Sequence, residues 1–270
     1  ADGQWIYYIS SREVDYDIYR VRFDGAETVQ LTSDPRDDIL PTLAPDLSLY
    51  YIRMEDEERN VDSPGGPEGT QLLMRLVEPG RAETVGLLPE TGRSCSPVAL
   101  SAAADGTIAI SDSCRFPDSV NFFHPNTIND TTRITEDFDQ SCINSLGFGF
   151  IAGSAQWANT EKLLAFAGAT CGDSGETTEW SDWENGLFLL DFRSTPRITT
   201  PLWEESFNDP ISSIDWSPDN RWITFGVSND IYLIPSQGGT PVRILEQGHS
   251  PVWRPTPDQE PEPLPVQQAT

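Results

Sequence analysis

The chain has 270 residues, and its 43 acidic residues outnumber its 17 basic ones to give a net charge of −26. This balance disfavours binding to nucleic acids and to anionic membranes, because contacts with phosphate groups need clustered lysine and arginine. No apolar run is long enough to span a membrane as a helix. The 22 prolines and 20 glycines, spaced between short apolar runs, predict many short β-strands joined by turns.

Two strand–turn–strand phrases alternate along the chain. In the first phrase, an apolar strand enters a turn of Pro, Asp, Asn or Gly and leaves as a second strand. This phrase occurs at 39–53, 96–111, 152–168 and 212–228. The second phrase is also a strand, a turn and a strand, and it occurs at 17–32, 70–88, 120–135, 185–199 and 229–245. One copy of each makes four antiparallel strands. The units recur about every 40 to 60 residues, which is the spacing of β-propeller blades.

The first phrase occurs a fifth time, divided between the two ends of the chain. SPVWRP (250–255) is its first half, and ADGQWIYYIS (1–10) is its second half. We therefore expect an all-β, five-bladed propeller of four-stranded antiparallel blades, which spans residues 1–257. Pro251 to Arg254 should add the innermost strand to the blade formed by residues 4–32, so that no free sheet edge remains. The Pro-, Glu- and Gln-rich residues 258–270 predict a tail or linker.

These phrases resemble the TolB-like, WD-like propeller repeat. WSPDNRWITF (216–225) and NDIYLIPSQGGTPVRIL (229–245) are similar to its Trp-Ser-Pro-Asp-Gly turn, Ile-Tyr strand and closing strand, and DIYRVRFDGAETVQLT is similar to its Asp-Gly turn and Leu-Thr ending. The resemblance is specific in the first and last blades, whereas the middle three blades are degenerate. It implies a periplasmic or extracellular protein-binding or sensory module without a fixed catalytic set. It also implies a turn at Asp219 and Asn220 and packing of Trp216 and Tyr232 between blades.

The four cysteines occupy related positions in the repeat. Antiparallel pairing about the Asp105-Gly106 turn should place Cys95 opposite Cys114, and the same logic brings Cys142 towards Cys171. We favour these two disulfides, which would indicate an oxidising compartment. Free buried thiols are the alternative. A zinc site is disfavoured, because the chain has no CxxC pair and its two histidines are distant in sequence.

One face of the predicted propeller is unusually long-looped and acidic. The loops that join blades and the loops between strands two and three should share this face, which we call the blade-joining face. Insertions concentrate on such faces because a rigid scaffold can present variable loops. The candidate binding residues on it are Asp37, Asp38, Glu57, Glu58, Asp137, Asp139, Trp180, Asp182, Trp183, Asp209 and His249.

Three functions fit this face. The first is a non-enzymatic recognition or assembly module for a protein, either a cationic partner or further copies of the chain, or for a glycan. The second is a glycoside-processing enzyme with paired carboxylates, although no pair stands out in the sequence. The third is binding of a structural calcium ion by clustered carboxylates, although no EF-hand loop is present. We favour the first.

Overall fold

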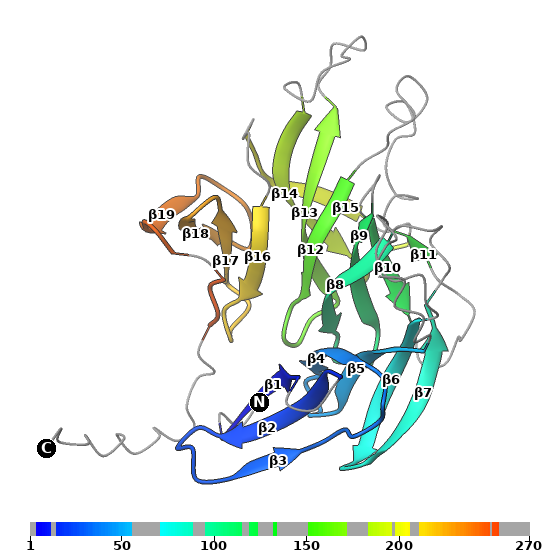
Figure 1. The fold of residues 1–270 in the computed structure, drawn as a ribbon. Helices are drawn as coiled ribbons and strands as arrows, with labels where there is room; N and C mark the ends of the chain where they lie inside the picture. Colours follow the sequence, from blue (N-terminus) through cyan, green and yellow to red (C-terminus); the bar gives the residue numbers. More distant parts are fainter. Residues whose placement is uncertain are drawn as a thin grey trace, which may run out of the picture.

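A computed structural model shows an all-β protein, and the residues that it describes form five antiparallel sheets (Figure 1). The structure describes residues 4–11, 15–55, 71–88, 95–114, 119–123, 132–133, 151–171, 183–195, 198–205, 211–248 and 250–253. No helix within these ranges is long and apolar enough to cross a membrane.

The strands follow one another outward in each sheet, in chain order. The first sheet holds β1 (Trp5–Ser10), β2 (Asp17–Arg22) and β3 (Thr28–Gln30). The second holds β4 (Asp38–Leu43), β5 (Leu49–Met54), β6 (Gln71–Glu78) and β7 (Arg81–Leu87). The third holds β8 (Cys95–Ala102), β9 (Ile108–Cys114), β10 (Ser119–Phe123) and β11 (Thr132–Arg133). The fourth holds β12 (Ile151–Trp157), β13 (Leu163–Cys171), β14 (Trp183–Asp191) and β15 (Ile198–Glu205), and the fifth holds β16 (Ile211–Trp216), β17 (Trp222–Val227), β18 (Asp230–Pro235) and β19 (Val242–Leu245).

We number the five sheets one to five along the chain and refer to each as a blade, although the first sheet has three strands among the described residues. The prediction of an all-β propeller with four-stranded antiparallel blades is confirmed for the four blades that begin at β4, β8, β12 and β16. The predicted turn is present too, since the Asn220 N–H donates to the carbonyl of Ser217 at 2.8 Å and Asn220 has a positive φ of 56°.

The core lies between the blades. Each of four clusters of buried apolar side chains joins two successive blades, from the first pair to the fourth. The first four residues of β5 are buried on both faces, because Leu49 and Tyr51 pack towards the first blade and Tyr50 and Ile52 pack towards the third. Trp216 packs between blades as expected: it is 2% exposed, and its indole N–H donates to the carbonyl of Gln156 on β12 at 2.9 Å. Burial of these aliphatic and aromatic side chains is the main favourable term in stacking the blades.

The predicted five-bladed closure is not formed by the described residues. Residues 251–253 are not a strand, and within the described ranges β1 pairs with β2 alone, so the first blade has three strands. Arg254 lies outside the described residues. Two local features disfavour a regular ladder: Pro251 has no N–H to donate, and Ser250 has a positive φ of 53°. The ring is open between β16 and β1 (Figure 1).

Candidate functional site: the acidic join between the first two blades

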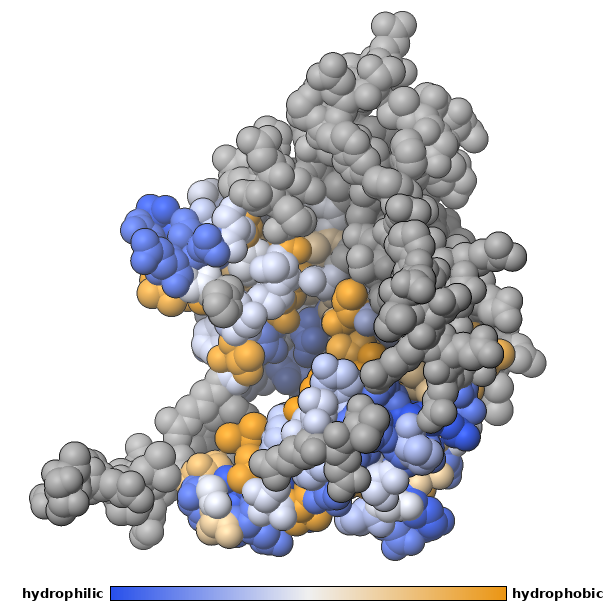
Figure 2. Space-filling view, viewed as in Figure 1, coloured by the Kyte–Doolittle hydropathy of each residue, from blue (hydrophilic) through white to orange (hydrophobic). Residues whose placement is uncertain are grey.

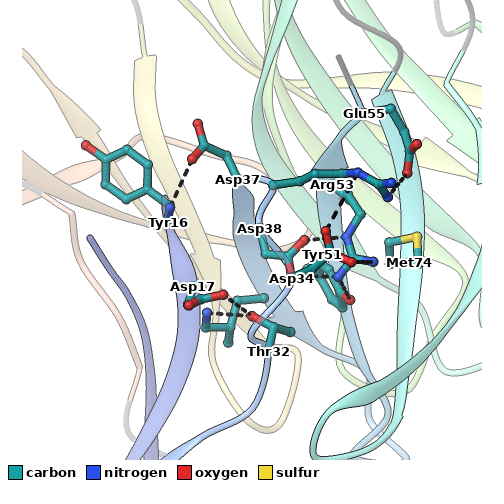
Figure 3. A network of polar contacts seen from close by, with 12 residues as sticks. Tyr16, Asp17, Thr32, Asp34, Asp37, Asp38, Tyr51, Arg53, Glu55 and Met74 are labelled. Carbon is teal, nitrogen blue, oxygen red and sulfur yellow. Dashed lines mark hydrogen bonds and ion pairs between the residues drawn. The ribbon is translucent and has the colours of Figure 1, made fainter. Parts of the chain in front are cut away.

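The best-described part of the blade-joining face is the segment that links the first two blades. It comprises residues 15–18, 31–38 and 53–55, where β2 begins, β4 begins and β5 ends. Figure 3 shows that their side chains converge into one polar network. Six acidic side chains occur in these segments against two arginines: Asp15, Asp17, Asp34, Asp37, Asp38 and Glu55 against Arg36 and Arg53.

The centre of this network is a buried ion pair. Asp38 and Arg53 stand opposite each other in the β4–β5 ladder, and Arg53 Nε and Nη2 donate to the two oxygens of Asp38 at 2.8 and 2.9 Å. Asp38 is 0% exposed. Burial raises the pKa of Asp38, and the Arg53 hydrogen bonds and charge counteract this only in part. Arg53 also meets Asp34 Oδ2 at 3.2 Å and donates to the Tyr51 hydroxyl at 3.2 Å.

A second buried carboxylate belongs to Asp17 at the start of β2. Gln30 Nε2 donates to Asp17 Oδ2 at 2.9 Å, and the Thr32 hydroxyl donates to Asp17 Oδ1 at 3.3 Å. Thr32 Oγ1 in turn accepts the Ile18 N–H at 2.9 Å. Burial raises the pKa of Asp17, and the nearby acids Asp15 and Asp38 add to this effect. These bonds fix the start of β2 to the residues that end and follow β3. The link to the second blade is made next to them, where the Asp38 N–H donates to the Tyr16 carbonyl at 2.7 Å.

The rim of the join is more accessible. Asp37 accepts the backbone N–H of Tyr16 at 2.9 Å, and Arg36 pairs with Glu55 at 2.8 Å. Arg36 Nε also lies 3.7 Å from Asp34 Oδ1. Both arginines of the join are thus engaged by its own acids. Among the residues that the structure describes, no group of three His, Cys, Asp or Glu side chains is arranged to hold a metal ion.

The structure places few of the predicted binding residues. Asp37 lies on the rim, whereas Asp38 is buried in its ion pair and does not face a partner. Trp183 begins β14, where its backbone pairs with that of Cys171. The remaining candidates lie outside the described residues: Glu57, Glu58, Asp137, Asp139, Trp180, Asp182, Asp209 and His249.

The cysteine register matches the prediction for one pair. Cys95 and Cys114 are directly opposite in the β8–β9 ladder. Directly opposite residues in an antiparallel pair have Cα atoms about 4.5–5.5 Å apart, which is within the range that a disulfide requires. Cys171 ends β13, and Cys142 lies outside the described residues. Both disulfides remain predictions.

Four members of this site were not predicted from the sequence: Asp17, Thr32, Tyr51 and Arg53. One signal was available. Arg53 is the only charged residue of the strand LYYIRM, and a cation in such a strand usually needs a nearby acid. The identity of that acid depends on strand register, which becomes clear only in the folded chain.

Comparison with solved structures identifies the architecture. A structure of a nidogen–laminin complex matches 94% of this chain and 82% of its own chain, with 12% identity and a TM-score of 0.56. The chain is a β-propeller. An oligogalacturonate lyase in complex with manganese matches 90% of this propeller with 14% identity and a TM-score of 0.51. A putative TolB from Agrobacterium tumefaciens matches 82% with 18% identity and a TM-score of 0.49, so TolB proteins are among the propellers matched.

These similarities concern the fold alone, because all three identities are low. The propeller spans 62% of the lyase chain and 66% of the TolB chain. No protein-family model matches the sequence, and no curated protein matches it.

Proposed function

We propose that this propeller is a non-enzymatic, extracytoplasmic recognition or assembly module that binds a protein partner through its acidic blade-joining face. The observation that carries this proposal is the charge of the described join, where four acids (Asp15, Asp34, Asp37 and Glu55) remain besides the buried Asp17 and Asp38, and where both arginines pair with the acids of the join. Such a surface favours a partner with basic side chains, because complementary charge accelerates encounter and repels wrong partners. The fold supports the proposal, since propellers present variable loops on a rigid ring.

The chemistry of the join favours binding over catalysis by paired carboxylates. Asp17 and Asp38 are the neighbouring acids with raised pKa values, which a glycoside-processing site would need. However, they are 3% and 0% exposed, and their oxygens accept hydrogen bonds from Gln30, Thr32 and Arg53. A substrate could not reach them. These two carboxylates therefore support the scaffold, and the rim is left to make contact.

An oxidising location agrees with the opposed positions of Cys95 and Cys114. Disulfides persist in secreted and periplasmic proteins and are rare in reducing compartments. A disulfide there would tie down the strand ends beside the blade-joining face.

The test compares two variants of equal charge. The face variant carries Asp37→Asn, Glu55→Gln, Glu57→Gln and Glu58→Gln. The control variant neutralises four exposed acids away from this face: Glu27, Glu78, Glu83 and Glu161, each replaced by Gln. A partner captured on the immobilised wild-type chain at low salt is identified, purified and titrated against all three proteins by interferometry.

We expect the face variant to bind about tenfold more weakly, mainly through slower association, and the control to bind like the wild type. Raising the salt concentration should reduce the difference, since it screens exposed charges. Equal binding by both variants would contradict the proposed face. Sedimentation of the unmixed protein distinguishes a second copy from a different partner.

A further inference from the structure

Arg20, in the middle of β2, differs from the other described cations of this acidic chain. It forms no ion pair with any acidic side chain that the structure describes. Every other lysine or arginine whose side chain is described forms such a pair: Arg22, Arg36, Arg53, Arg75, Arg81, Lys162, Arg193, Arg221 and Arg243. Because acids outnumber bases 43 to 17 in the sequence, a cation without an acid needs an explanation.

The Arg20 side chain lies against the indole of Trp5. Its guanidinium carbon Cζ is 4.2 Å from the centre of the Trp5 ring. Both side chains lie on one face of the β1–β2 ladder, because Trp5 pairs with Arg22, which is two residues from Arg20. This cation–π contact attracts the guanidinium to the ring and leaves its hydrogen-bond donors unused.

One of those donors is buried. Arg20 Nε is covered and makes no hydrogen bond within the described part of the chain. The residue as a whole is half-buried, so Nη1 and Nη2, at the end of the side chain, are the donors that a ligand could reach. The indole contact and the burial of Nε restrict the guanidinium, and a restricted donor pair loses less entropy when it binds.

The acids nearest in sequence do not neutralise Arg20. Asp24 accepts from Arg22 Nε and Nη2 at 3.3 and 3.2 Å. Asp17 is three residues from Arg20, so its side chain is on the opposite face of β2, where it is buried. Within the described residues, the charge of Arg20 is therefore available to a group from outside the chain.

We propose that Arg20 and Trp5 form a binding site for a carboxylate carried by a ligand or a partner. The planar fork of a guanidinium matches the two oxygens of a carboxylate. A phosphate would bring more negative charge towards a protein whose net charge is −26, and a single arginine would not balance it. Figure 2 shows hydrophilic residues interspersed with apolar ones over the first sheet, at the bottom of the view, so these surroundings suit a charged ligand.

This inference is independent of the proposed function. The acidic join recruits a basic group, whereas Arg20 takes an acidic one, and neither Arg20 nor Trp5 belongs to the join. A failure of one site therefore leaves the other intact.

NMR spectra of the arginine side chains test the site in the full chain. The Nε–H signals are recorded at mildly acidic pH, where these protons exchange slowly, and the Arg20→Lys spectrum assigns the signal of Arg20. The probes are acetate, for a free carboxylate, and an end-blocked Gly-Glu-Gly peptide, for an acidic side chain. Chloride and phosphate are the control anions, and Arg75, which pairs with Glu83 at 2.6 Å, is the control arginine.

We expect acetate or the peptide to shift the Arg20 signal saturably and to leave the Arg75 signal in place. Chloride and phosphate should bind at least about tenfold more weakly, because they do not match the fork. Tighter binding of the peptide than of acetate would identify an acidic side chain as the natural source, and otherwise the source is a small carboxylate. The proposal would be overturned by an unshifted Arg20 signal, by equal shifts of Arg20 and Arg75, or by phosphate that binds as tightly as acetate.

Three variants separate charge from geometry. In variants that lack Arg20, the indole N–H signal of Trp5 reports binding. Arg20→Lys keeps the charge and loses the fork, so it should bind acetate about tenfold more weakly, whereas Arg75→Lys should bind like the wild type. Trp5→Leu should weaken binding roughly threefold to fivefold, because loss of the cation–π contact releases the guanidinium. Wild-type affinity in Arg20→Lys would contradict recognition by the guanidinium.

Discussion

Asp38 is fully buried, and its charge is paired with that of Arg53. Removing a carboxylate from water costs several kcal/mol, and the bidentate pair with Arg53 offsets that cost only while both partners are present. The two residues are opposite in the ladder, so the pairing of β4 with β5 also sets the ion pair.

Loss of Arg53 should therefore destabilise the fold strongly. We expect Arg53→Met to lower the free energy of unfolding by about 3–5 kcal/mol, because Asp38 remains buried without its partner. The double variant Asp38→Leu/Arg53→Met should recover most of this loss. Urea unfolding measures these free energies. The control is Arg193→Met, which removes the exposed ion pair with Asp191 and should lower the free energy of unfolding by less than about 1 kcal/mol. A double variant as unstable as the single one would contradict this account.

Lys162, the only lysine, joins the turns of the third and fourth blades through Asp105 at 2.8 Å. Partial burial alone would raise the pKa of Asp105, but the hydrogen bonds from Lys162 and Thr107 outweigh it and lower the pKa to about 2. The folded-state pKa is thus below the unfolded value of 3.8. The pair stabilises the fold above about pH 4, and this stabilisation is lost as the pH falls through 2.

Removal of this pair should change the acid response. Between pH 5 and pH 2, the free energy of unfolding of the wild type should fall by roughly 0.5–1 kcal/mol more than that of Lys162→Met. This value is reduced for solvent screening, because the site is exposed. Denaturant midpoints at the two pH values measure it. Parallel losses in both proteins would show that the pair contributes nothing.

At the scale of elements, the β8–β9 hairpin provides the clearest test of the cysteine prediction. We expect the free energy of unfolding of the double variant Cys95→Ser/Cys114→Ser to be about 2–4 kcal/mol lower than that of the oxidised wild type, because the bridge restricts the unfolded chain. Reductant should bring the wild type close to the variant. If both cysteines of the unfolded, oxidised protein react with a thiol reagent, no such bridge exists.

The strand phrases and turns could be predicted because they depend on local sequence. The alternation of apolar residues with Pro, Asp and Gly turns is enough to define each blade, and it also placed Cys95 opposite Cys114. The burial of Asp38 could not be predicted, because PRDDIL reads as a polar loop until the register supplies Arg53. The unpaired state of residues 251–253 was missed for a related reason. Their similarity to Ile211–Trp216 predicts a strand, but whether that strand pairs depends on how the first and fifth blades pack, which local sequence does not determine.

At the scale of the molecule, charge and stacking have separate roles. Four apolar clusters hold successive blades together, while acidic side chains such as Asp24, Asp46 and Glu161 are exposed in the described turns. Within the join, the buried acids stabilise the scaffold, and the rim acids Asp37 and Glu55 contribute negative charge to the surface. The central claim is that a partner contacts this face.

Hydrogen exchange of the full chain with and without its captured partner tests that claim most directly. We predict slower exchange at residues 31–38 and 53–55, where the first two blades join. Exchange should be unchanged at the turns of the opposite face, residues 23–27, 103–107 and 217–221. Protection of those turns without protection of the join would contradict the account.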